Sequence, residues 1–150
     1  MTDQLSKPAI ALGADHAGFD LKELLKAELL VDGYTVLDLG TFSDSSVDYP
    51  DFGRAVADAV SDGRAPMGVV VCGTGIGISI AANRNLGVRA ALCHSGLEAR
   101  LARQHNDANV LALGSRIIGS EAAKDALNAF LTTEFEGGRH QGRVAKLGQS

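Results

Sequence analysis

The sequence contains no tryptophan, three prolines and two cysteines, and aromatic residues make up only 5% of its 150 residues. Cys72 and Cys93 are far apart and form no Cys-x-x-Cys pattern, which argues against a zinc site or a disulfide framework. No apolar run is long enough to span a bilayer, and the polar first four residues do not resemble a signal peptide. We therefore expect a reduced, cytoplasmic protein without metal or membrane anchor.

The chain also lacks a large excess of charge of one sign. The 14 basic and 18 acidic side chains give a formal net charge of -4, which argues against nucleic acid as the main partner. Glycine, in contrast, is abundant, with 18 residues, as is typical of α/β proteins with many tight turns. A chain of this length can bury its own core, so we expect residues 1–150 to form a single domain.

Apolar runs typical of strands alternate with helical patterns along the chain. Because a helix follows each expected strand, the pattern favours a three-layer α/β/α domain with a five-stranded parallel, Rossmann-like sheet. The expected strands are residues 9–12, 35–39, 67–71, 90–93 and 110–113. The expected helices lie around residues 21–29, 51–63, 77–83, 97–103 and 120–131, with Ser120 as the cap of the last one. From about Gly137 the chain becomes basic, and we expect a short flexible arm.

The strand expected at 67–71 leads into Cys72, which is followed by the turn Gly73-Thr74-Gly75-Ile76-Gly77. Glycines allow left-handed backbone angles and a close approach of a ligand. Successive N–H groups of such a turn can converge on an anion, and the start of the next helix adds positive potential. The segment therefore predicts an anion site beside a thiol.

Three common anion-binding loops do not fit, and each fails at Ile78. A dinucleotide fingerprint needs glycine there, a phosphate-binding P-loop needs lysine there, and a thiol phosphatase needs arginine there. A simpler interpretation of Cys72 also stands, because most free cysteines are small buried hydrophobes.

Polar side chains follow most of the expected strands. They are Asp15 and His16 after the first, Cys72 after the third, His94 after the fourth, and Ser115 and Arg116 after the fifth. The carboxyl ends of parallel strands share one edge, so we expect these groups to converge there. Singly, Asp15 can be a helix cap, and His94 and His140 can be surface residues. Their joint placement favours a catalytic site.

Six sequence blocks resemble type B ribose-5-phosphate isomerases, a family grouped with galactose-6-phosphate isomerase subunits. The blocks are residues 15–18, 48–50, 72–77 with 79–83, 105–111, 114–116 and 137–144. The resemblance implies interconversion of an aldose phosphate and a ketose phosphate without metal or organic cofactor. It also implies dimers, often paired into tetramers, with sites at the subunit interface.

The same resemblance implies a role for each matching residue. Cys72 would be the base that moves a proton between C1 and C2, and Ile76 stands where some relatives carry a glutamate base instead. His105 would help to open the furanose ring, and Asp15 would handle hydroxyl protons. The enediolate oxygen would be held by Thr74, Gly73, Gly75 and Gly77. The phosphate would be bound by His16, Arg116, Arg139 and Arg143, and the pocket would be lined by Tyr49 and Asn106.

Several alternatives stay open. The motifs are shared by enzymes for four-, five- and six-carbon phosphates, and ribose 5-phosphate is expected only because it is frequent in the family. A non-catalytic sugar-phosphate sensor would need neither Cys72 nor His105. A redox protein would need a resolving thiol, whereas Cys93 lies inside a strand pattern.

The basic arm suggests how the chain assembles. Gly137-Gly138 breaks away from the last expected helix, and a short basic arm is poorly suited to order on its own domain. We therefore expect a homodimer with two shared sites, each taking Cys72 from one chain and Arg139 and Arg143 from the other.

Overall fold

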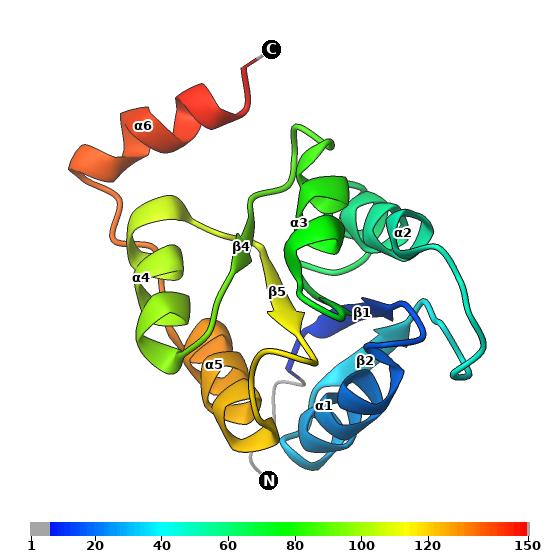
Figure 1. Ribbon diagram of the computed structural model, residues 1–150. Helices are drawn as coiled ribbons and strands as arrows, with labels where there is room; N and C mark the ends of the chain where they lie inside the picture. Colours follow the sequence, from blue (N-terminus) through cyan, green and yellow to red (C-terminus); the bar gives the residue numbers. More distant parts are fainter. Residues whose placement is uncertain (1–6, 150) are drawn as a thin grey trace, which may run out of the picture.

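Within residues 7–149, which the computed structural model describes, five parallel strands form one sheet in the order β2-β1-β3-β5-β4 (Figure 1). The strands are β1 (Ala9–Ala14), β2 (Thr35–Asp38), β3 (Met67–Cys72), β4 (Ala90–Leu92) and β5 (Val110–Gly114). The helices are α1 (Phe19–Val31), α2 (Tyr49–Ser61), α3 (Ile76–Asn83), α4 (Gly96–Asn106), α5 (Ser120–Thr132) and α6 (Arg139–Leu147). The predicted fold class is confirmed. The first four residues, on which the absence of a signal peptide was argued, lie outside the described residues.

Helices cover both faces of the sheet. Leu25 of α1 and Phe130 of α5 belong to a buried cluster on one face, whereas Val56 of α2 and Ile78 of α3 belong to a cluster on the other. The central strand β3 feeds both clusters, because its successive side chains point to opposite faces. A strand buried on both faces reads as a continuous apolar run, which is why β3 was easy to predict. In the described part of the chain, none of the helices combines the length and apolarity needed to cross a bilayer.

The strand order determines where a crevice opens. From β1 the chain moves to β2 on one side, and it later returns to β3 on the other side of β1. The turns after β1 and β3 therefore leave the sheet toward opposite faces, which is where ligands bind in open parallel sheets. This topology brings the end of β1, with Asp15, beside the end of β3, with Cys72; the Asp15 N–H donates to the Val71 carbonyl at 3.2 Å.

Two sequence expectations need correction. Ser120 does not cap α5, because Gly119 occupies the cap position and its carbonyl accepts the first helical hydrogen bond, from the Ala123 N–H at 3.0 Å. The expected flexible arm is the helix α6, which lies apart from the layers beside α4 in Figure 1. Gly137 and Gly138 both have positive φ, at 66° and 56°, and this sharp turn lets a new helix begin.

Candidate active site

Cys72 closes β3 and is only 4% exposed. Its Sγ accepts a hydrogen bond from the Gly75 N–H at 3.1 Å. This contact depends on the left-handed conformation of Gly75, with φ at 79°, which turns the chain back over the sulfur just before α3 begins. Backbone N–H donors beside a sulfur stabilise negative charge on it, as a catalytic thiolate requires.

Neighbouring atoms leave no room for side chains at Gly75 and Gly77 of this turn. A Cβ at Gly75 would lie 2.5 Å from Leu92 Cδ1 and 2.8 Å from the Leu113 carbonyl carbon. At Gly77 it would lie 2.5 Å from the ring of Tyr49, so the absence of a side chain lets this ring pack against the turn. Thr74 is exposed and its Oγ1 accepts the Ile76 N–H at 3.2 Å. The turn therefore offers a hydroxyl and a close backbone surface to a ligand.

The turn after β1 presents a carboxylate and an imidazole. Asp15 is buried, and its Oδ1 accepts the Gly18 N–H at 3.0 Å, just before α1. This oxygen closes the turn before the helix but does not cap α1, because Gly18 occupies the cap position and no side chain of residues 7–149 caps this end; the capping interpretation of Asp15 is therefore wrong. His16 Nδ1 accepts the Val47 N–H at 3.1 Å. The proton of a neutral His16 is therefore assigned to Nε2, which leaves that nitrogen as a donor for an anion.

The turn after β5 joins the other two. Ser115 donates its N–H to the Cys72 carbonyl at 2.9 Å and its hydroxyl to the Ala17 carbonyl at 2.8 Å. The Arg116 N–H donates to the Gly73 carbonyl at 2.9 Å, and a Cβ at Gly73 would lie 3.2 Å from Arg116 Nη1. We call the residues gathered here the carboxyl-edge group. They are Asp15, His16, Tyr49, Cys72, Gly73, Thr74, Gly75, Gly77 and Arg116.

A buried ion pair supports this edge from β2. Lys22 is 1% exposed, and its Nζ lies 2.8 Å from both carboxylate oxygens of Asp38; Lys26 lies 3.0 Å from one of them. Asp38 also accepts the Gly40 N–H, and the Gly40 carbonyl accepts the Ala14 N–H at 2.7 Å. Burial raises the pKa of Asp38, but the hydrogen bonds from Lys22, Gly40 and Lys26 outweigh it and hold that pKa below its ordinary value.

The other predicted residues lie at the opposite edge of the sheet. His105 and Asn106 end α4, and the Gly68 N–H at the start of β3 donates to the carbonyl of Asn109 at 2.9 Å. The end of α4 is therefore level with the start of β3, and the strand from Gly68 to Cys72 spans about 13 Å. The amino-edge group, as we call it, consists of His105, Asn106, Arg139 and Arg143. Within one chain it does not meet the thiol.

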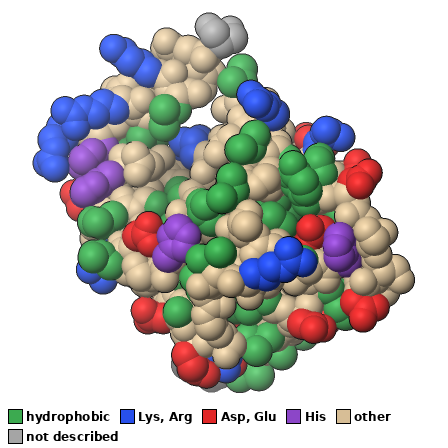
Figure 2. Space-filling view, viewed as in Figure 1, with side chains coloured by type: hydrophobic (Ala, Val, Ile, Leu, Met, Phe, Trp, Pro, Cys, Tyr) green, Lys and Arg blue, Asp and Glu red, His purple; other side chains and the backbone are tan. Residues whose placement is uncertain are grey.

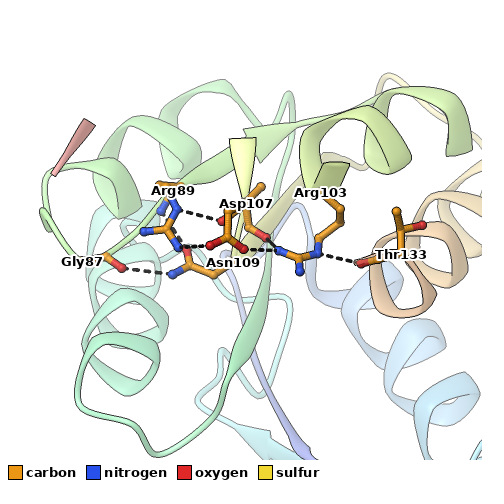
Figure 3. Close-up of polar contacts among 7 residues, drawn as sticks. Gly87, Arg89, Arg103, Asp107, Asn109 and Thr133 are labelled. Carbon is orange, nitrogen blue, oxygen red and sulfur yellow. Dashed lines mark hydrogen bonds and ion pairs between the residues drawn. The ribbon is translucent and has the colours of Figure 1, made fainter. Parts of the chain in front are cut away.

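Side chains fix the end of α4 (Figure 3). Asp107 ends the helix with φ at 47°, in the left-handed region. Its carboxylate accepts from Arg103 Nη1 at 3.0 Å, and its carbonyl accepts from Arg89 Nε at 2.7 Å. Arg103 Nε also donates to the Thr133 carbonyl, at 3.0 Å. The last turn of α4 is thus bound to the start of β4 and to the end of α5.

His140 was expected at the surface, and this expectation is wrong. It is 6% exposed and stacks on His105, with ring centroids 4.5 Å apart and ring planes 17° apart. The sequence contains no pattern that predicts this contact, because it joins α6 to the end of α4, which lies much earlier in the chain. His94, in contrast, is exposed as expected and faces Glu98. Figure 2 shows Lys, Arg and His side chains gathered over α6 and the adjoining end of α4.

The charges around the stacked rings suit an anion. Burial lowers the pKa of His140, and the nearby Arg139 and His105 lower it further. One possible metal-ligating atom from each of His105, Glu136 and His140 lies within 4.8 Å of the others. Arg139 and Arg143 add positive charge beside these groups, which disfavours a metal cation there.

The two cysteines differ in chemistry. Cys93 is 1% exposed in the core, as predicted, and burial together with Glu98 raises its pKa to about 12. It therefore stays protonated and offers no resolving thiol to Cys72. The structure therefore does not support a redox role for the pair. Cys72 is the cysteine whose sulfur lies beside a backbone N–H donor and other polar groups.

Comparisons with known proteins identify the family to which this chain belongs. A family model described as Ribose/Galactose Isomerase matches residues 10–147. The ribose-5-phosphate isomerase B of Escherichia coli (strain K12) is 51% identical over 138 residues, which cover 92% of this chain and 93% of that protein. The D-erythrulose-4-phosphate isomerase of Pectobacterium atrosepticum is 44% identical over 141 residues, 93% of each chain. The structure of Clostridium thermocellum ribose-5-phosphate isomerase B matches with a TM-score of 0.93 at 51% identity, over 94% of this chain and 95% of that one.

Proposed function

Because the chain belongs to the ribose/galactose isomerase family, we propose that it interconverts ribose 5-phosphate and ribulose 5-phosphate through proton transfer by Cys72. The chain is an aldose–ketose isomerase of sugar phosphates, as its family and its relatives indicate. The observation that carries the cysteine mechanism is the 3.1 Å hydrogen bond from the Gly75 N–H to Cys72 Sγ. It places a thiolate-stabilising donor at the edge that also holds Asp15, His16 and Arg116.

The chemistry follows from the carboxyl-edge group. Isomerisation moves a proton between adjacent carbons of a planar enediolate, and one base on one face can serve both. Cys72 as a thiolate takes the proton from C2 of the aldose and returns it to C1. The Thr74 hydroxyl and the N–H groups of the glycine turn stabilise the oxygen that becomes negative. Asp15 moves protons between the sugar hydroxyls.

Phosphate binding supplies the energy that positions the reacting end. A phosphate monoester carries about -1.5 to -2 charges, which Nε2–H of His16 and the guanidinium of Arg116 meet from one chain. Arg139 and Arg143 lie at the other edge and reach a phosphate only from a second chain. His105 and Asn106 lie beside them, so they enter the shared site with the arm.

A second copy of the chain is also favoured by exposed apolar side chains. Ile76 and Ile80 are 52% and 50% exposed, one turn apart on α3 and directly after the Cys72 turn. Such a patch beside a catalytic turn suits an interface. Two-fold pairing across it brings the amino-edge group of each subunit to the carboxyl-edge group of the other and completes two sites. We propose a homodimer, or a tetramer of two such dimers, in the cytoplasm.

The substrate is tested with a panel of tetrose, pentose and hexose phosphates assayed for aldose–ketose exchange. The ribose-specific name of the more similar relative, at 51% identity against 44% for the erythrulose-4-phosphate enzyme, favours the pentose. We expect the highest kcat/KM with ribose 5-phosphate. A maximum with another chain length corrects the substrate but keeps the chemistry. Tight binding without any turnover means that the protein is a sensor.

Mixing inactive variants tests the shared site. Cys72→Ala and the double variant Arg139→Ala/Arg143→Ala damage opposite edges, so half of randomly mixed dimers are hybrids with one intact site each. Activity should return to about a quarter of the wild-type sites under two-fold symmetry. Cys72→Ala mixed with Arg116→Ala is the matched control, because both changes damage the same edge and no intact site forms. Equal behaviour of the two mixtures, after verified subunit exchange, refutes the shared site.

A further inference from the structure

Among the residues of helix α6, one side chain is buried against the rest of the chain. Within Arg139–Leu147 only His140 is buried, and its ring lies flat against His105 with centroids 4.5 Å apart. His140 Nε2 has no hydrogen-bond partner among residues 7–149. His140 therefore contacts His105 at the end of α4 through the face of its ring, and its Nε2 forms no hydrogen bond within the described residues that would orient this contact.

The orientation of the His105 ring needs such a contact. The Asp107 network fixes the backbone of the last turn of α4, but not the side-chain torsions of His105. The torsion that rotates a histidine ring has a broad energy minimum, so neighbouring groups decide the plane of the ring. His105 is only partly buried, and the face of His140 is the aromatic contact that the structure gives it.

We propose that His140 is a positioning residue, which holds the His105 imidazole by stacking in the orientation that opens the sugar ring. This inference rests on the proposed function, in which His105 opens the furanose. His140 itself needs no proton and no contact with the substrate for this role. A flat ring of any kind at position 140 is sufficient, and this separates the proposal from a role in binding phosphate through its nitrogens.

Two variants separate the flat face from the filled space. His140→Phe keeps a flat ring and loses the nitrogens, whereas His140→Leu fills similar space without one. A small misplacement of a catalytic group lowers a rate by up to about 100-fold. We expect His140→Leu to lose about 10-fold in kcat with ribose 5-phosphate and His140→Phe to stay within about 3-fold of the wild type. Tetrose 4-phosphates, which cannot close a furanose ring, should distinguish the two variants far less.

A double-mutant cycle shows whether His140 acts through His105. In a His105→Asn background, His140→Leu should no longer change the ratio of pentose to tetrose rates. The ring protons of His105, assigned by their loss in His105→Asn, should keep their ring-current shifts in His140→Phe and lose them in His140→Leu. Thermal unfolding verifies that each variant folds.

The outcomes are distinct. If both His140 variants retain the wild-type rate ratio, or if His140→Phe is as impaired as His140→Leu, the positioning role is wrong while the isomerase function stands. If the folded wild-type protein converts no sugar phosphate of the panel, the proposed function is wrong and this role is wrong with it.

Discussion

At the carboxyl edge of the sheet, hydrogen bonds to main-chain carbonyls join the turns after three strands, whereas at the amino edge the candidate groups are held through interactions between side chains. Ser115 alone ties its turn to Cys72 and to Ala17. At the amino edge, by contrast, Asp107 fixes the end of α4 and His140 stacks on His105. The fold of one chain thus joins the three turns around the thiol, and it leaves Arg139 and Arg143 exposed at the other edge.

The largest effect that separates the two halves is expected from Cys72→Ala. Loss of the proposed base should lower kcat by about 10²–10⁴-fold and leave the fold intact. Cys93→Ala is the matched control, because it removes the buried thiol of the core; it should keep kcat and lower the free energy of unfolding by about 1 kcal/mol. More than about a tenth of the wild-type rate in Cys72→Ala would show that another group is the base.

The next largest effects are expected from the carboxylates that support the two edges, Asp38 and Asp107, which should differ in how much they stabilise the fold. Asp38→Asn leaves the buried Lys22 without its main partner, which should lower the free energy of unfolding by about 3 kcal/mol at pH 7. Asp107→Asn should lose about 1 kcal/mol, because its ion pairs are more exposed and asparagine also adopts left-handed angles. Chemical denaturation measures both. Equal losses would remove the energetic distinction between the edges.

The contribution of Asp38 to the free energy of unfolding should also depend on pH, and it should decrease at acidic pH. The folded-state pKa of Asp38 lies below its ordinary value, so the ionised carboxylate stabilises the fold at all pH values above the unfolded pKa, about 4. This contribution is lost as the pH falls through the lower folded pKa. The difference in stability between wild type and Asp38→Asn should therefore be full at pH 7 and narrow below about pH 4. A constant difference would mean that the ion pair is not its source.

Two glycines give the last contrast, which includes the smallest expected effect. Gly75→Ala forces a Cβ against Leu92 and strains a left-handed residue, so it should lower the free energy of unfolding by about 2 kcal/mol. Gly142 in α6 has open space around it, and Gly142→Ala should change the global value by less than about 0.5 kcal/mol. Thermal unfolding of the two variants measures how much less an added methyl group is tolerated at Gly75 than at Gly142. A tolerated alanine at position 75 would contradict the crowding described for this turn.

The sequence predicted the sheet and most of the carboxyl-edge group because both follow from short-range patterns, whereas Tyr49 was expected only from the family resemblance. Apolar runs mark the strands, and parallel topology then places whatever follows each strand at one edge. The position of His105 could also have been derived, since a helix after a parallel strand must run back and end at the other edge. His140 could not, because its burial depends on how α6 docks after two glycines. Lys22 was missed although it shares a helix face with Leu25 and Leu29, which was a usable signal.

Helix α6 buries a single side chain, and this has a consequence for how the protein can change. Detaching α6 exposes little apolar surface, so local opening requires far less free energy than unfolding of the sheet, and the amides of α6 should exchange hydrogen much faster than those of β3 and β5. Exposed positions of α6 then contribute little to the stability of the fold. Substitutions can accumulate there while the core that folds the chain is left unchanged.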